Sequence, residues 1–461
     1  MRESAAANDN LFQSTTMTTR SCHWYRGSLA AAVAVVCLAA PLHAQPVPIA
    51  SAPGPALVKP TFVPRNAAGI YALGDTVAWT ATLPSDSAPA PGGYLYKIRK
   101  NNLEILETGV LDFSKGPATI DVVVREPMMV YVEVTVPGYE AGAVAKLGAA
   151  VAPSKLTPAV PRPVDFDEFW DARLKALAAV PIDPVVTPVE SPDPSVELFS
   201  VALRSVGSTA RGWLAKPKRP GPYPALVLLQ WAGVYKLTPK SAVDRAAEGW
   251  LVLNVSSHDL PLDQEQDPVV PRRYGDVGAL SRETSYFLNM YLRDVRGVDY
   301  IASRPDWDGR TLVLMGTSMG GQQSLVTAAL HPKVTAVLVN EPAGADANGD
   351  LHGRKAGYPN WDAELPQIMQ TARYFDVVNF APRITAPAVV TLGFIDTITP
   401  PVGIWTAFNQ MKGPKELIPM IESDHNNRTP EKQGDWEARW RAVLKTLVDG
   451  GTFVPTPTAT P

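Results

Sequence analysis

A serine stands in the segment Gly316–Gly321, which reads Gly-Thr-Ser-Met-Gly-Gly, between an apolar run and a stretch suited to a helix. A Gly-x-Ser-x-Gly pattern in this setting is typical of a nucleophile elbow, a strained strand-to-helix turn that projects the serine hydroxyl above a sheet. Such a turn needs small residues two before and two after the serine, as Gly316 and Gly320 are. The backbone N–H of Met319 would then face a developing oxyanion at the positive end of the helix. Ser318 is therefore predicted to be a nucleophile, with a chance match in a loop as the alternative.

A serine nucleophile needs a base, and in sites of this kind the histidine follows both the serine and the acid in the chain. His258 precedes the serine, His331 closes the predicted serine helix, and His352 lies in a Gly-rich loop. His425 follows the apolar run 417–421, shortly before the last predicted helix. It is the predicted base, and a surface-loop histidine without a role is the alternative.

The orienting acid should leave the strand that precedes the histidine strand. The apolar run 388–392 continues into Gly-Phe-Ile-Asp, which places Asp396 in the loop just beyond it. A carboxylate there would fix the imidazole tautomer and stabilise the imidazolium. Glu341, at the end of the run before, is the alternative acid. Asp424 is adjacent to His425 in sequence and therefore points poorly for this task.

A second oxyanion donor is expected from the loop that follows the apolar run 225–229 and begins Gln230-Trp231-Ala232. A backbone N–H is sufficient, and loss of one such donor typically costs about 3–4 kcal/mol of transition-state stabilisation. Trp231 is the favoured position and Ala232 could substitute. A plain packing role for the Trp231 side chain is compatible with either.

The elements that must position these residues alternate along residues 160–450. Short apolar runs suggest buried parallel strands, and the stretches between them have helical character, so we expect a mostly parallel sheet covered by helices on both faces. The predicted strands are 225–229, 251–255, 311–315, 335–339, 388–392 and 417–421, and the predicted helices are 165–179, 285–303, 321–330 and 435–448. Together with the elbow, this pattern predicts an α/β-hydrolase fold.

Residues 61–150 have a different hydrophobic pattern. Apolar residues alternate with polar or small ones around Val77–Leu83 and Val130–Val136, and turn-forming residues separate the runs. Several short alternating runs of this kind predict a small β-sandwich-like domain. Residues 45–60, rich in Pro and Ala, are predicted to be a linker, and residues 451–461 a disordered tail.

The chain has 461 residues, which favours more than one domain, and 46% hydrophobic residues, which is enough for a sizeable core. The formal net charge of −3 gives no argument for binding nucleic acid or an anionic membrane. No clustered metal-ligand pattern and no convincing dinucleotide-binding fingerprint is present, so neither a metal nor a cofactor is predicted.

The N-terminal residues 1–44 resemble a cleavable signal peptide: arginines precede an apolar run of about a dozen residues, and Ala44 offers a small residue for cleavage. Met17 is a possible true start. Cleavage after Ala44 would remove Cys22 and Cys37, and with them any disulfide or cysteine nucleophile. The mature protein is predicted to be periplasmic or secreted, with an uncut membrane anchor as the alternative.

Four segments resemble the acetyl xylan esterase and cephalosporin C deacetylase family, carbohydrate esterase family seven. In order, they are Pro163–Trp170, Tyr291–Asp299, Gly316–Gly321 and Asp396–Pro401, the last followed by His425. The resemblance implies an α/β-hydrolase that removes acetyl groups from small acetylated saccharides, often as a symmetric oligomer.

By residue, the resemblance implies that Ser318, Asp396 and His425 form the triad and that the Trp231 and Met319 amides form the oxyanion hole. Met319 stands where the family commonly has Gln, and Leu229–Trp231 replaces its His-Gly-Tyr. These departures put the substrate in doubt. The N-terminal β-domain is an addition that weakens transfer of the family's oligomerisation.

These observations lead to three hypotheses about function. The preferred one is an exported serine esterase that hydrolyses acetyl esters of saccharides through an acyl-enzyme. The second is a broader carboxylesterase or a peptidase on the same fold, since fold does not fix substrate. The third is a non-catalytic binding protein, which the complete Ser/Asp/His set disfavours.

Overall fold

The computed structural model describes residues 57–458, except 86, 91, 140–141, 265–272 and 427. The predicted signal peptide, the alternative start at Met17, both cysteines and residues 45–56 of the predicted linker lie outside the described residues. From Leu57 onward the chain forms one compact unit. Within the part that is described, no helix combines the length and apolar character that a membrane span needs.

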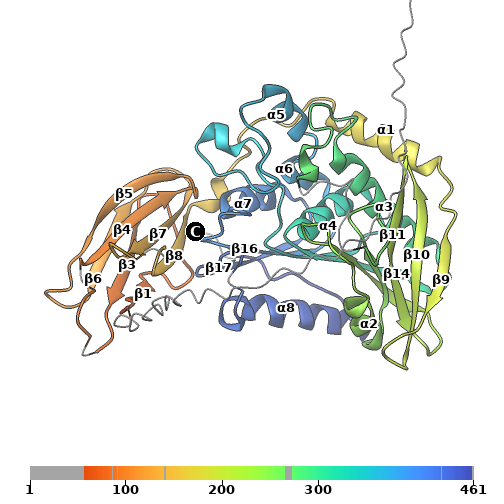
Figure 1. The fold of residues 1–461 in the computed structure, drawn as a ribbon, viewed down its shortest axis with the longest axis horizontal. Coiled ribbons are helices and arrows are strands. Elements are labelled where there is room, and N and C mark those ends of the chain that lie inside the picture. Colours follow the sequence, from red (N-terminus) through yellow and green to blue (C-terminus); the bar gives the residue numbers. More distant parts are fainter. Residues whose placement is uncertain are drawn as a thin grey trace, which may run out of the picture. The chain divides into compact units, whose positions relative to one another are not determined.

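The N-terminal region is built from two small sheets that share a core (Figure 1). One sheet has the strand order β1 (Thr61–Pro64), β3 (Thr76–Thr82), β6 (Ala118–Val123). The other has the order β2 (Ile70–Tyr71), β8 (Ala145–Val151), β7 (Met128–Thr135), β4 (Tyr94–Lys100), β5 (Glu104–Leu111). Val77, Trp79 and Val132 are fully buried between them. The alternation of apolar and polar residues thus supplies the inner face of each sheet.

The C-terminal region is organised around a nine-stranded sheet. Its strand order is β17 (Lys415–Met420), β16 (Ala388–Gly393), β15 (Ala336–Asn340), β14 (Trp307–Thr317), β12 (Tyr223–Leu229), β13 (Leu251–Val255), β11 (Ser208–Pro217), β10 (Val196–Ser205), β9 (Val185–Val189). The strands from β17 to β13 pair in parallel, whereas β11, β10 and β9 continue the sheet antiparallel. This is an α/β-hydrolase fold preceded by a β-rich region.

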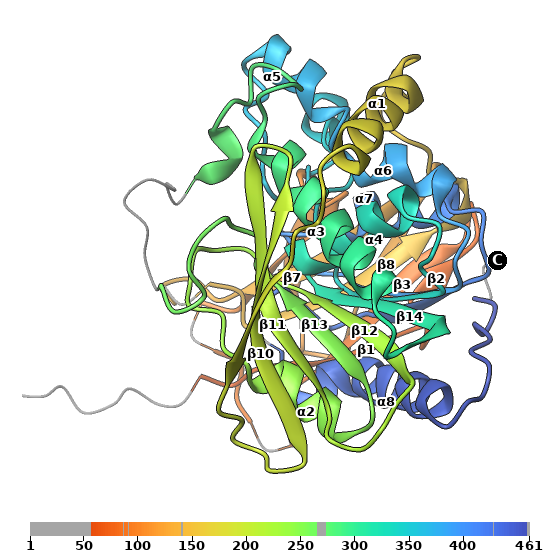
Figure 2. The same cartoon turned by 90° about the vertical axis from the view of Figure 1, so that its right-hand side faces the viewer.

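Helices cover both faces of this sheet, with α3 and α4 on one face and α2 and α8 on the other (Figure 1 and Figure 2). The helices are α1 (Phe166–Ala178), α2 (Lys240–Ala247), α3 (Tyr286–Ser303), α4 (Met319–Leu330), α5 (Pro366–Ala372), α6 (Val377–Phe380), α7 (Pro401–Gln410) and α8 (Pro430–Val448); short 3₁₀ turns are η1 (Pro153–Lys155), η2 (Tyr274–Asp276), η3 (Gly349–His352) and η4 (Ala381–Arg383). Along β12, Val227 packs into the core on the α3/α4 face and Leu226 into the core on the α2/α8 face. Two-sided burial explains why the parallel strands are nearly continuous apolar runs.

The structure differs from the predicted element list in three respects. The helices α2, α5, α6 and α7 were not among the predicted ones. The antiparallel strands β9, β10 and β11 were not expected, because partly exposed residues interrupt them and they contain no continuous apolar run. Residues 451–458 of the predicted disordered tail lie against β17: Phe453 is buried, and the Thr458 hydroxyl accepts a hydrogen bond from the Leu417 amide at 2.7 Å. The burial of one aromatic ring and the free edge of β17 account for this difference.

Candidate active site

Ser318 occupies the turn between β14 and α4 in a strained conformation. Its φ of 57° and ψ of −122° lie in a region that few non-glycine residues adopt. A Cβ added to Gly316 would lie 2.3 Å from the Gly320 backbone, and one added to Gly320 would lie 2.2 Å from the Leu229 carbonyl oxygen. The turn is therefore too tight for any side chain at these two positions.

The three predicted triad residues lie in hydrogen-bonding contact. His425 Nε2 is 2.9 Å from Ser318 Oγ, and His425 Nδ1 is 2.8 Å from Asp396 Oδ2. All three come from loops at the carboxyl ends of the parallel strands β14, β16 and β17. With the carboxylate on Nδ1, the proton sits on that nitrogen and Nε2 is free to accept from the serine.

Asp396 is fully buried, and the loop before α7 holds its carboxylate. Its Oδ1 accepts from the backbone amides of Ile398 and Thr399 at 2.8 and 2.9 Å, and its Oδ2 accepts from the Thr399 hydroxyl at 2.7 Å. Four hydrogen bonds, counting that of His425, fix the position of this carboxylate.

Glu341, the alternative acid, lies beside the triad but outside its hydrogen-bond chain. Its carboxylate accepts from the Ser423 hydroxyl at 2.9 Å and pairs with Arg428 at 2.8 Å. Burial and, after it, the neighbouring Asp396 charge raise the pKa of Glu341, and Arg428 opposes that shift. Glu341 thus braces the loop that precedes His425 and adds a second carboxylate close to the imidazole.

Glu341, Asp396 and His425 are also the described residues whose metal-ligand atoms cluster, all within 4.8 Å of one another. Each of these groups already has a protein partner: Asp396 and His425 bind each other, and Glu341 binds Arg428. Such an arrangement serves proton transfer, and a metal would have to break the hydrogen bond between the acid and the histidine.

The two predicted oxyanion donors have different surroundings. Among the described residues no hydrogen bond uses the Met319 amide, which is the first N–H of α4. The Trp231 amide faces the hydroxyl of Tyr235. Burial raises the pKa of this hydroxyl, and its contacts with the Gln230 side chain and the Trp231 amide oppose that shift. The Ala232 amide has no such partner among the described residues.

A polar network behind this loop was missed by the sequence analysis. His258 Nε2 lies 3.1 Å from the Gly233 carbonyl oxygen, and His258 Nδ1 lies 2.7 Å from the Tyr286 hydroxyl. The Tyr274 hydroxyl accepts from the Gly233 amide at 3.3 Å and lies 3.1 Å from Met319 Sδ. Both backbone polar groups of Gly233 are thereby held. The available signal was the position of His258 just beyond β13, at the sheet edge where functional residues gather.

Burial lowers the pKa of His258 to about 4, with a further lowering by Arg293 and an opposing effect of the Gly233 carbonyl. A neutral imidazole with its proton on Nε2 satisfies both neighbours, because it donates to Gly233 and accepts from Tyr286. The structure places His331 next to Asp299 at 3.2 Å and His352 in η3, so neither belongs to the Ser318 cluster.

The sequence profile of the family described as acetyl xylan esterase (AXE1) matches residues 154–347 and 358–443. An acetyl esterase of Xylanibacter ruminicola, Axe7A, is 30% identical over 381 residues, covering 79% of this chain and 86% of its own. The chain belongs to the acetyl xylan esterase family. It is a carboxylic ester hydrolase, and the resemblance drawn from the sequence is confirmed.

Solved structures support the fold of this esterase. The acetyl xylan esterase of Paenibacillus sp. R4 has a TM-score of 0.56 at 22% identity, covering 64% of this chain and 98% of its own. Acetyl xylan esterase 1 of Thermoanaerobacterium sp. JW/SL YS485 has a TM-score of 0.54 at 22% identity, covering 63% of this chain and 97% of its own. These two proteins are thus matched almost over their full length while more than a third of this chain is left over. The match with Axe7A, in contrast, covers more than the part from residue 160 onward and so reaches into the β-rich region.

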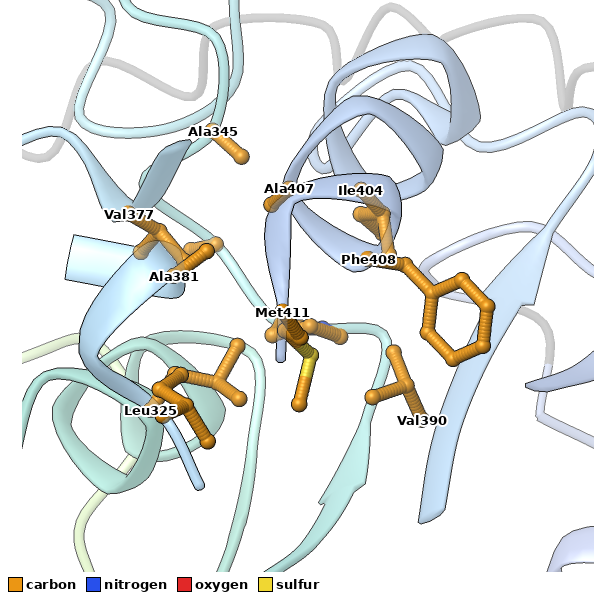
Figure 3. Close-up of a pocket in the computed structure, with 12 residues that line it drawn as sticks. Leu325, Ala345, Val377, Ala381, Val390, Ile404, Ala407, Phe408 and Met411 are labelled. Atoms are coloured by element: carbon orange, nitrogen blue, oxygen red, sulfur yellow. The ribbon is translucent and has the colours of Figure 1, made fainter. Parts of the chain in front are cut away.

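Two hollows in the esterase differ in what they can hold. A small cavity of about 10 Å³ lies between α4, α6 and α7. Figure 3 shows its apolar lining, which includes Leu325, Ile404 and Met411. A buried water needs a similar volume and two to four polar partners, so this cavity is a dry packing gap. An open cleft of about 480 Å³ lies against α2 and α8 and reaches Thr317, the residue before the nucleophile. Trp231 and Trp440 are among the residues that line it, and none of the three triad residues does. Its size suits a small-molecule ligand.

Proposed function

We propose that this esterase hydrolyses acetyl esters of saccharides, with Ser318 as nucleophile, His425 as general base and Asp396 as orienting acid. The observation that carries the proposal is the chain of two hydrogen bonds, at 2.9 and 2.8 Å, from the serine through the imidazole to the buried carboxylate. Family membership supports the acetyl ester as substrate class.

In the proposed reaction Ser318 Oγ attacks the acetyl carbonyl carbon while His425 Nε2 takes its proton. The imidazolium then protonates the leaving sugar oxygen, and the C–O bond of the ester breaks. A water molecule attacks the acetyl-serine with His425 again as base, and acetate leaves with the serine regenerated. Asp396 stays ionised and stabilises each imidazolium.

The Met319 amide is the first oxyanion donor in this proposal, because it is the first N–H of α4 and adds the positive end of that helix. The second donor comes from the loop after β12, at Trp231 or, as the alternative, at Ala232. The Gly233 anchors described above keep this loop in place.

The exposed ring of Trp231, which lines the open cleft that reaches Thr317, is the proposed contact for the sugar. The Trp231 side chain is 58% exposed and packs against Tyr235, with ring centroids 5.7 Å apart. Exposed aromatic faces with polar neighbours provide amphipathic surfaces, which suit a ring that carries both C–H faces and hydroxyl groups.

We also propose that the protein acts outside the cytoplasm after cleavage of residues 1–44. The basic start, the apolar run and the small residue at position 44 support this. N-terminal sequencing of the protein recovered from the medium and the periplasm of a bacterial host tests it. A protein retained with an intact N-terminus would contradict the proposal.

Acetate release by the purified protein from acetylated xylo-oligosaccharides and aryl acetates tests the proposed activity. Ser318→Ala should abolish release, while Ser195→Ala, in an exposed turn before β10, should retain it. Cleavage of aryl or longer acyl esters alone would favour the broader carboxylesterase. Retained activity in Ser318→Ala would overturn the nucleophile assignment.

A further inference from the structure

The hairpin between β4 and β5 ends in a turn whose two central residues are both asparagines. Asn101 and Asn102 have φ values of 49° and 59°, and the Leu103 amide donates to the Lys100 carbonyl at 3.0 Å. Positive φ at both positions defines a tight hairpin turn that asparagine tolerates. Hairpin tips usually lie in solvent, yet these side chains are only 4% and 7% exposed. Two buried amides at a tip need partners elsewhere in the molecule.

Asn101 fastens the turn to its surroundings. Its carboxamide oxygen accepts from the Met129 amide at 3.0 Å within the β-rich region. Its backbone carbonyl accepts from the Lys355 amide at 2.9 Å, and its Nδ2 donates to the Gly353 carbonyl at 3.4 Å. The turn is therefore anchored on both sides, in the β-rich region and in the hydrolase.

Asn102 reaches the peptide of the proposed catalytic acid. Its Nδ2 donates to the backbone carbonyl oxygen of Asp396 at 2.6 Å. The same Asp396 receives His425 on its carboxylate. A residue 294 positions earlier in the chain thus fixes the backbone from which the orienting carboxylate projects.

A second strand of the β-rich region contacts the same two loops. The Gly148 amide of β8 donates to the Ile421 carbonyl at 3.0 Å, four residues before His425. A Cβ at Gly148 would lie 2.2 Å from Phe394 Cβ, two residues before Asp396. The absence of a side chain at Gly148 is what allows β8 to approach both loops.

We propose that the β-rich region is a positioning element for the active site, with Asn102 as the residue that sets the Asp396 peptide and, through it, the aspartate–histidine hydrogen bond. This inference rests on the proposed triad. Two solved relatives are matched almost over their full length, yet these matches cover only 64% and 63% of this chain. The acid loop here depends on a contact from outside the hydrolase fold.

The test uses the full chain carrying Asn102→Gly, because glycine accepts the positive φ and removes only the amide. We expect kcat for an aryl acetate to fall about tenfold with KM within about twofold, since small displacements of catalytic groups lower the rate more than binding. A looser Asp396 stabilises the imidazolium less, so the acid limb of the kcat/KM profile should move to lower pH by about half a unit. Asn102→Ser, which keeps a hydroxyl donor, should lose less.

Asn409→Ala is the matched control. Asn409 Nδ2 also donates to backbone carbonyls, those of Pro153 and Leu156 at 2.8 and 3.0 Å, but from the C-terminal end of α7, the end of that helix away from the acid loop. This variant should lower Tm and leave kcat and the pH limb unchanged. A native kcat and pH limb in Asn102→Gly, or equal losses of kcat in both variants in proportion to Tm, would overturn the inference. Because Ser318→Ala is measured alongside, an inactive serine variant with a native Asn102→Gly would refute the positioning role alone, whereas an active serine variant would refute the proposed function.

Discussion

A partly buried histidine, His425, and a buried one, His258, lie beyond the carboxyl ends of strands of the central sheet and use the imidazole in opposite ways. His425 has a carboxylate on Nδ1 and a serine hydroxyl on Nε2. His258 has a tyrosine hydroxyl on Nδ1 and a backbone carbonyl on Nε2, and Arg293 adds a positive charge nearby. In each imidazole both ring nitrogens have a hydrogen-bond partner, so the number of hydrogen bonds does not distinguish the two histidines.

The charge of the partners makes the difference. An imidazolium at His425 would be stabilised by the buried Asp396 carboxylate, which suits a base that must accept a proton during each cycle. An imidazolium at His258 would face neutral groups and Arg293, so the ring stays neutral and serves as a fixed donor to Gly233. A histidine becomes a proton carrier only where an acid accompanies it.

Removing that acid should have the largest effect. In Asp396→Asn the amide favours the wrong imidazole tautomer, and we expect kcat to fall by about 10³–10⁴-fold with little change in KM. Steady-state hydrolysis of an aryl acetate measures this. Glu341→Gln is the control, since Glu341 contacts Ser423 and Arg428 rather than the imidazole, and it should lose less than about tenfold. Equal losses in the two variants would make Glu341 a partner in orienting His425.

The neutral state of His258 should affect the pH dependence of the free energy of unfolding rather than the rate of hydrolysis. The pKa of His258 is about 4 in the folded protein against 6.5 for the ordinary group. As pH falls, His258 therefore takes up a proton in the unfolded chain before it does so in the folded protein. The stability that comes from keeping His258 neutral is complete above pH 6.5 and is lost as pH falls towards 4. The difference amounts to about 3 kcal/mol of unfolding free energy.

Urea unfolding of the wild type and of His258→Gln between pH 7 and 4 measures this contribution. Glutamine can still donate to Gly233 but does not titrate, so the variant should start less stable and lose less stability on acidification. Glu341 is present in both proteins, so the effect of its raised pKa on the free energy of unfolding is the same in each and cancels in the comparison. Parallel stability curves for the two proteins would show that His258 is not held neutral.

The smallest effect is expected at the exposed side of the oxyanion loop. Trp231→Ala keeps the backbone amide but removes the exposed ring, so kcat for aryl acetates should change less than about twofold. KM for acetylated xylo-oligosaccharides should rise severalfold, because the ring is the proposed sugar surface. A matched rise in KM for both substrate classes would locate the sugar elsewhere.

The sequence was informative where chemistry imposes a local pattern. The glycines at 316 and 320 are needed because no Cβ fits there. The predicted strand 388–392 ends one residue before Gly393, where the structure ends β16. The loops that carry Asp396 and His425 could be found because each follows a strand buried on both faces.

The sequence was silent where function depends on contacts between distant segments. Nothing around Asn102 in the chain indicates that its amide meets the Asp396 carbonyl, and nothing around His258 identifies Tyr286 or Gly233 as its partners. The strands β9 to β11 lie on the outer part of the sheet, where one face is partly exposed. Polar residues therefore interrupt their apolar residues, and the sequence shows no continuous apolar run there. Pairings of this kind follow from topology, which a single sequence does not state.

The contact between the C-terminal residues and β17 bears on how the protein behaves in a crowded solution. β17 is an edge strand of the nine-stranded sheet, and a bare edge offers unpaired amides and carbonyls to any other extended chain. The Thr458 hydroxyl binds the Leu417 amide, and the Thr456 amide binds the Glu416 carboxylate. Residues 456–458 therefore occupy polar groups of this edge and hinder intermolecular strand pairing, so removing the chain from residue 453 onward should promote aggregation before it affects catalysis.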